Sequence, residues 1–113
     1  MFRDCTSLTT APELPATTLA TSCYRYMFKG CSSLTQAPDL PAETLANSCY
    51  EGMFSGCISL TSITCLATDI SASSALTGWT YGVASSGTFY KATEVEWPTG
   101  VSGIPSGWTV VEI

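Results

Sequence analysis

Six cysteines are the residues of this 113-residue chain that are best suited by type to covalent chemistry. Cys5, Cys31 and Cys57 are spaced 26 residues apart, and Cys23 and Cys49 share that spacing. A nucleophilic cysteine needs a base or cation that lowers its pKa, usually histidine, and the chain contains no histidine. The cysteines also lack the C-x2-C spacing of zinc sites. We therefore expect core packing or disulfides, and predict no catalytic residue, no metal site and no cofactor.

The redox state of these cysteines follows from the way in which they would stack. Residues at the same position of successive repeats point the same way, which is poor geometry for a disulfide with a dihedral angle near 90°. We therefore expect most of the thiols to be reduced. A location at the cell surface would favour oxidation, and that alternative stays open.

Acidic residues recur with the same period, in the pairs Glu13 with Asp39 and Glu43 with Asp69. Paired carboxylates can do acid–base chemistry or hold calcium. No stretch of this chain supplies the additional, closely spaced oxygen ligands that a calcium loop needs. The favoured interpretation is therefore a solvated surface.

Aromatic residues offer a second kind of site, a platform on which sugars stack. Tyr24 and Tyr50 recur on an apolar face and are expected to pack in the core. Trp97, between Glu96 and Pro98, is the best candidate for an exposed ring. Its alternative role is to cover the open end of a stack of repeats.

Polar residues recur in two columns at the outward positions of the expected strands. The columns are Thr10, Gln36 and Ser62, and Thr9, Thr35 and Thr61. A regular polar face suits a protein partner, because stacked repeats present extended binding surfaces. Any soluble repeat protein must also show such a face to water, and both interpretations stay open. Together with Trp97, these six residues are the candidate partner-binding face.

The elements that position these residues follow from the 26-residue period itself. A fixed period of 20 to 50 residues is typical of a solenoid, in which each unit buries its apolar face against its neighbours. Apolar residues at positions 23, 24, 27, 28 and 31 predict one face of a short helix. Ser22 would cap its start and Gly30 its end, as Ser48 and Gly56 would in the next repeat.

A short extended segment is expected after each helix. Leu34 and Ala37, and later Leu60 and Ile63, would point inward from segments that stack into a parallel sheet. Pro38, like Pro12, would end the segment and turn the chain back.

The repeats are expected to occupy residues 1–83 and a β-rich cap residues 84–113. Residues 1–22 form a partial repeat, 23–48 and 49–74 are complete, and a degenerate repeat begins at 75. In the cap, the runs TFYK and WTVVEI predict two strands joined by a loop rich in proline and glycine. The first repeat, with its inward residues Met1 and Phe2, lacks an upstream neighbour, so we expect it to continue a longer array or to self-associate through its edge.

The repeat unit M-F-x-G-C-x-S-L-T-x-A-P-x-L-P resembles the leucine-rich repeats of BspA-like surface proteins common in Bacteroidetes. The expected fold is an α/β, right-handed leucine-rich-repeat solenoid with a small β-rich C-terminal cap. The resemblance implies a secreted or surface-anchored protein used in adhesion. Its partner would be an extracellular protein, or a glycan, of a host or neighbouring cell. The alternatives are a carbohydrate-binding surface protein and a spacer without a ligand.

Composition excludes two other classes of partner. The net charge is −5, and nucleic acid would demand clustered Lys and Arg. Only Arg3, Arg25, Lys29 and Lys91 are basic, and in the sequence they do not cluster. No apolar run is long enough to span a membrane, and no secretion signal is recognisable.

Overall fold

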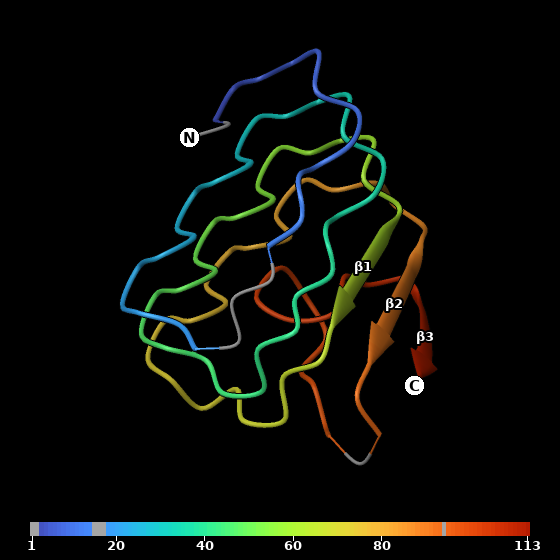
Figure 1. Cartoon of the computed structure of the whole chain (residues 1–113). Helices are drawn as coiled ribbons and strands as arrows, with labels where there is room; N and C mark the ends of the chain where they lie inside the picture. Colours follow the sequence, from blue (N-terminus) through green and yellow to red (C-terminus); the bar gives the residue numbers. More distant parts are fainter. Residues whose placement is uncertain (1–2, 15–17, 94) are drawn as a thin grey trace.

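In the described part of the chain, the regular secondary structure consists of three short strands in one open sheet. The computed structural model describes residues 3–14, 18–93 and 95–113. The strands are β1 (Ser62–Cys65), β2 (Thr88–Lys91) and β3 (Thr109–Glu112), all parallel and in the order β1-β2-β3 (Figure 1). Over those residues no helix is present. The predicted α/β leucine-rich-repeat solenoid with helices is therefore wrong, and no helix of the described part could cross a membrane.

The 26-residue period appears in space as a stack of coils. Single parallel bridges join Thr10 to Gln36 and Gln36 to Ser62, and β1 continues the series by pairing Ser62 with Thr88 of β2. The extended segments expected in the first two repeats are thus reduced to bridges, and a strand forms only in the third. Figure 1 shows these coils lying one upon another, with β1–β3 along one flank.

The segments predicted as helices are chains of tight turns. We call residues 22–30, 48–56 and 74–82 the turn segments. In the first of them, the amide of Met27 donates to the carbonyl of Tyr24, three residues back, at 3.1 Å. Amides that alternate with these donate instead to the next coil, as the amide of Tyr24 does to the carbonyl of Cys49 at 3.0 Å. An α-helix would need bonds four residues back along the whole segment.

A period of four residues, rather than 3.6, explains why the helix prediction failed. The backbone has a positive φ at every fourth residue of the first turn segment: Ser22 (58°), Tyr26 (56°) and Gly30 (80°). The spacing i, i+1, i+4, i+5, i+8 fits this arrangement as well as it fits a helix. Ser22 and Ser48 are therefore not helix caps. Gly30 and Gly56 have the expected left-handed backbone but end no helix.

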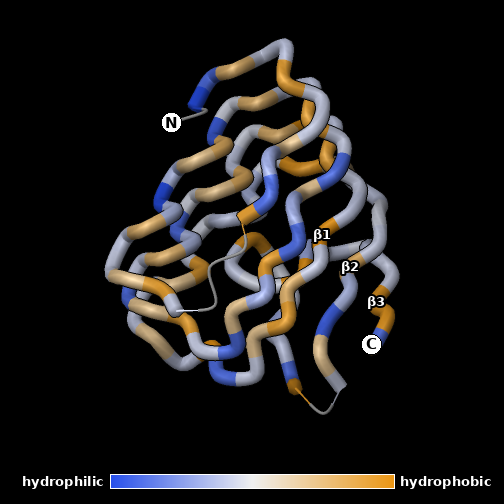
Figure 2. Tube along the Cα trace, in the orientation of Figure 1, coloured by the Kyte–Doolittle hydropathy of each residue, from blue (hydrophilic) through white to orange (hydrophobic). Residues whose placement is uncertain are grey.

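The core lies between the turn segments on one flank and the strands on the other. Rings stack along the coils, with Phe28 on Phe54 at 5.8 Å between centroids and Tyr50 on Trp79 at 5.9 Å. Figure 2 shows that apolar residues recur in successive coils rather than in one block. Each coil therefore buries its apolar residues mainly against its neighbours, as a repeating stack requires.

The two strands expected in the C-terminal tail are confirmed as β2 and β3. They lie in the same sheet as β1, and Thr88 of β2 still follows its partner Ser62 by one full period. The last coil is shorter, because β3 places Thr109 beside Thr88. The division of the chain at residue 84 stays a prediction.

Candidate binding surfaces

The predicted polar columns lie side by side on the strand flank. Parallel bridges connect Thr10, Gln36 and Ser62 in that order, so this column is continuous across three coils. In the second column, the amide of Thr61 donates to the carbonyl of Thr35 at 3.0 Å, and its hydroxyl approaches the same oxygen at 3.3 Å. Of the six residues, Ser62 is half-buried and the others are exposed, Thr9 among them.

Trp97, the seventh candidate, packs against the core rather than standing free. Its ring stacks on Trp79 at 5.8 Å between centroids and meets Phe89 edge-on at 5.0 Å. The ring is half-buried and forms one wall of a cleft of about 390 Å³ at the C-terminal end of the stack. Trp108 and Ile104 also line this cleft. The structure thus gives Trp97 the packing contacts of a covering residue and, at the same time, a place beside a cleft.

The indole nitrogen of Trp97 differs from those of the other two tryptophans. Trp79 Nε1 donates to the carbonyl of Gly103 at 2.9 Å, and Trp108 Nε1 donates to Ala84 at 2.8 Å. Trp97 Nε1 is buried and has no acceptor among the described residues. A buried donor without a partner costs about 1–3 kcal/mol, so this group favours any acceptor that reaches it.

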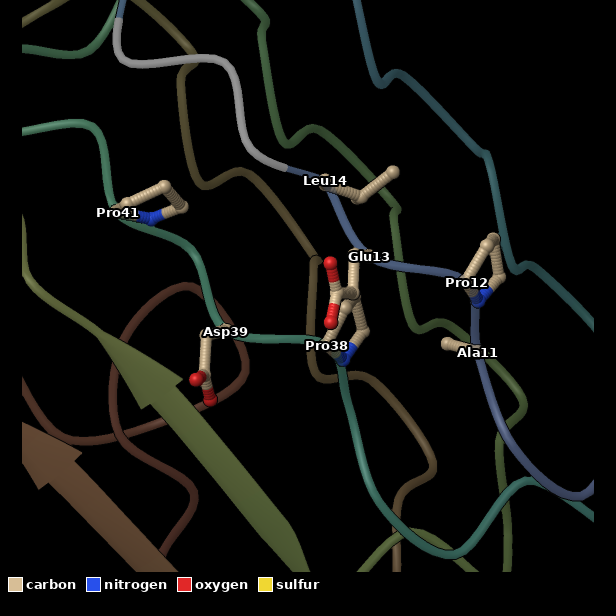
Figure 3. A pocket seen from close by; sticks show the side chains of 7 residues that line it. All are labelled: Ala11, Pro12, Glu13, Leu14, Pro38, Asp39 and Pro41. Atoms are coloured by element: carbon tan, nitrogen blue, oxygen red, sulfur yellow. The ribbon is translucent and has the colours of Figure 1, made fainter.

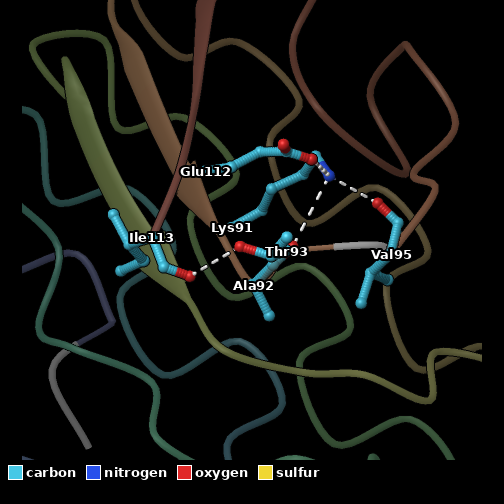
Figure 4. A network of polar contacts seen from close by, with 6 residues as sticks. All are labelled: Lys91, Ala92, Thr93, Val95, Glu112 and Ile113. Carbon is cyan, nitrogen blue, oxygen red and sulfur yellow. Dashed lines mark hydrogen bonds and ion pairs between the residues drawn. The ribbon is translucent and has the colours of Figure 1, made fainter.

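A charged network borders the same cleft (Figure 4). Lys91 Nζ donates to the carbonyl of Val95 at 2.6 Å and pairs with Glu112 at 2.8 Å. The Thr93 hydroxyl donates to the carbonyl of Ile113 at 3.2 Å. These contacts connect the end of β3 with the end of β2 and the residues that follow it.

Four of the six cysteines lie in the core, whereas Cys5 and Cys23 are half-buried. No disulfide joins two cysteines in the described part of the chain, and Cys31, Cys49, Cys57 and Cys65 are fully buried. Burial raises the pKa of Cys49 to about 11, and raises those of Cys57 and Cys65 to about 12. Such thiols stay protonated at neutral pH. A protonated thiol is a poor nucleophile, because the thiolate is the reactive form.

The carboxylate pair Glu13 and Asp39 lies on the surface, beside a shallow hollow of about 240 Å³ (Figure 3). Prolines dominate the rest of its lining, with Pro12, Pro38 and Pro41. The other pair, Glu43 and Asp69, is also exposed. Among the described residues, no three His, Cys, Asp or Glu side chains come close enough together to hold a metal ion.

A cluster that sequence reasoning missed surrounds Tyr26. Three basic side chains approach its ring, with Arg25 at 4.7 Å, Lys29 at 5.0 Å and Arg3 at 5.7 Å from the centroid. The expectation that the basic residues do not cluster is therefore wrong. The signal was the period itself, because Arg3 and Lys29 are one repeat apart and stack on successive coils.

One carboxylate joins this cluster. Glu51 accepts a hydrogen bond from the Tyr26 hydroxyl at 3.2 Å and forms an ion pair with Arg25 at 3.3 Å. Bonding to Tyr26 and the charge of Glu51 raise the pKa of Arg25. A hydrogen bond from Ser48, together with Tyr26 and Arg25, lowers the pKa of Glu51. Both groups are charged at neutral pH.

Comparison of the chain with protein-family models, curated proteins and solved structures gave no match.

Proposed function

We propose that this chain is a non-enzymatic binding module of a bacterial cell-surface or secreted protein, and that its partner is an extracellular protein. The observation that carries the proposal is the polar face formed by the columns through Gln36 and Thr35. Its residues are in register across three coils and are mostly exposed. The surface location rests on the resemblance of the repeat unit to BspA-like surface proteins.

The chemistry of this face favours a partner that forms many weak hydrogen bonds. Threonine and glutamine side chains both donate and accept, and they recur at the spacing of the stacked coils. An extended protein segment could meet the same groups in each coil.

The test is a binding screen against extracellular-matrix proteins with immobilised wild-type chain. Thr35→Lys/Gln36→Lys places two long cations on the polar face, and we expect at least about tenfold weaker binding of any partner found. Ser73→Lys/Thr77→Lys is the matched control, because both residues are exposed on the turn flank. Equal loss in the two variants, or no partner at all, would count against the polar face.

A carbohydrate ligand is the second candidate, and the cleft beside Trp97 favours it. The cleft has an aromatic wall, against which the C–H face of a sugar ring can pack. A glycan array with wild type and Trp97→Ala tests this directly, since the substitution removes the aromatic wall of the cleft. Silence on both the array and the protein screen would favour the third candidate, a spacer without a ligand.

A further inference from the structure

The basic residues of this acidic chain are gathered at one place. The net charge is −5 with four Lys and Arg in all, yet three of these four approach the single ring of Tyr26. The fourth, Lys91, belongs to the network at the end of β3. Repulsion between like charges opposes such a gathering, so it is a feature that needs an explanation.

The backbone of Tyr26 is strained for a tyrosine. Its φ is 56°, and the residues at the same place in the next two coils are Gly52 (60°) and Gly78 (61°). A residue with a bulky side chain in this region costs about 1–2 kcal/mol that glycine does not. The ring lies over Gly52, where an added Cβ would collide with it. The left-handed φ follows from the four-residue turn period, but the tyrosine at this position does not, because glycine occupies it in the next two coils.

The charges around the ring are only partly compensated. Glu51 neutralises Arg25, whose side chain is 46% exposed. Arg3 and Lys29 form no ion pair with any of the residues that the structure describes. Two cations thus remain available beside an aromatic ring, on the flank opposite the polar columns.

We propose that the Tyr26 cluster binds an anionic sugar unit, a sulfated or carboxylated ring of an acidic polysaccharide. Arg3 and Lys29 would meet its sulfate or carboxylate, with Arg25 held in place by Glu51. The C–H groups of the sugar would pack against the exposed part of the Tyr26 ring. This site is independent of the polar face, so either can fail without the other.

The choice of a sugar over an acidic peptide follows from the geometry of the cluster. A sugar ring holds its anionic group and its C–H face rigidly together, so it can present both at once to the cations and the ring of the cluster. An acidic peptide would have to immobilise each flexible side chain, at about 0.5–1.5 kcal/mol for each. An exposed site with few charges gains too little from each contact to offset that loss.

The test measures binding of a sulfated hexasaccharide by the whole chain at low and at moderate salt, with a neutral hexasaccharide and a poly-glutamate peptide in parallel. Wild type should bind the sulfated sugar best, and more weakly as salt rises. Arg3→Gln/Lys29→Gln should bind about tenfold more weakly, because it removes the two unpaired cations. Tyr26→Gly should also lose affinity, although it relieves the strained φ and leaves the melting temperature within a few degrees of wild type.

The single variant Lys29→Gln is measured as well, and its control is Ser86→Glu, which makes the same change in net charge at an exposed position outside the cluster. If it weakens binding as much as Lys29→Gln does, the attraction is only a matter of net charge and the site is refuted. Equal or tighter binding of poly-glutamate would overturn the assignment to a polysaccharide. No preference of wild type for the sulfated over the neutral sugar would overturn the proposal as a whole.

Discussion

The turn segments and the β-strands lie on the same coils but use their backbone hydrogen bonds differently. In β2, pairing runs to both neighbours, with Thr88 beside Ser62 on one side and Thr109 on the other. In the turn segments, every second amide bonds within its own coil, as Met27 does with Tyr24. In the first two turn segments, the remaining amides reach the next coil. The turn segments therefore make about half of their backbone hydrogen bonds without a neighbouring coil. The strands make theirs only with the strands beside them.

This difference also decides which residues each flank requires. A chain of tight turns needs a left-handed backbone at every fourth position, which glycine adopts without strain. The strands need side chains that alternate between core and solvent, as buried Ile63 and Cys65 alternate with the half-buried Ser62 and Thr64 of β1. The two flanks thus respond to different substitutions.

Substitution of Trp79 should lower the stability most, because this residue connects the turn segments with the strands. It lies in a turn segment and is fully buried. Its ring contacts Phe54 of the preceding turn segment and Phe89 of β2. We expect Trp79→Ala to lower the free energy of unfolding by about 3–5 kcal/mol in urea titrations. Trp79→Phe, which keeps a ring, should lose clearly less. Equal losses would mean that the ring does not join the two flanks.

Alkaline pH should destabilise both flanks through their buried thiols. Burial raises the pKa of Cys57, which follows a turn segment, and of Cys65 in β1 to about 12, whereas an unfolded thiol titrates near 8.5. The unfolded chain releases these protons first, so stability is unaffected below about pH 8 and falls as pH rises towards 12. The slope is about 1.4 kcal/mol per pH unit for each thiol.

Urea titrations between pH 7 and 11 would measure that slope. Cys57→Ala and Cys65→Ala should each flatten it by a similar amount, since the two thiols have similar pKa values. A slope unchanged in both variants would show that other groups, such as the buried Tyr50, cause the loss.

Two glycines of the turn segments provide a matched pair. Gly52 and Gly78 have nearly the same φ, 60° and 61°, but a Cβ at Gly52 would collide with the Tyr26 ring, whereas Gly78 has open space. We expect Gly78→Ala to cost about 1 kcal/mol and Gly52→Ala at least about 2 kcal/mol. The difference, read from thermal unfolding of the two variants, isolates the contact with Tyr26. A Gly52→Ala variant as stable as Gly78→Ala would mean that the ring moves aside freely.

Trp97→Phe should have the smallest effect. It removes a buried donor that has no acceptor among the described residues, while keeping a ring against Trp79 and Phe89. The loss of indole contacts and the relief of the unsatisfied group oppose each other, so the net change should lie within about 1 kcal/mol. Calorimetric melting would check it. A loss above about 2 kcal/mol would indicate that the indole nitrogen has a partner after all.

The sequence was sufficient to predict the stacking and the polar columns but not the conformation of the turn segments. Repetition every 26 residues predicts that Thr10, Gln36 and Ser62 align, whatever the local backbone. The helix at 22–30 could not be excluded from its apolar spacing. Gly52 and Gly78 in the middle of the repeated segment were the available signal, because glycine disfavours a helix by about 1 kcal/mol.

The candidate sites divide in the same way. The cluster around Tyr26 joins Arg3 to Lys29 across coils, and it was recoverable from the period. The burial of Trp97 could not be recovered from the period. Its partners Trp79 and Phe89 are not separated from it by the 26-residue repeat. Tertiary packing of the short last coil determined that contact.

The alternate amides of the turn segments have a consequence for how such a chain can change length during evolution. Ser48, Tyr50 and Phe54 bond to the coil after them in the same way as Ser22, Tyr24 and Phe28 bond to theirs. A duplication of 26 codons would insert a layer that offers each neighbour the contacts it already makes. The protein would grow in whole steps of about 4.8 Å, whereas a duplication that is not a multiple of 26 codons would insert a layer that does not repeat these contacts.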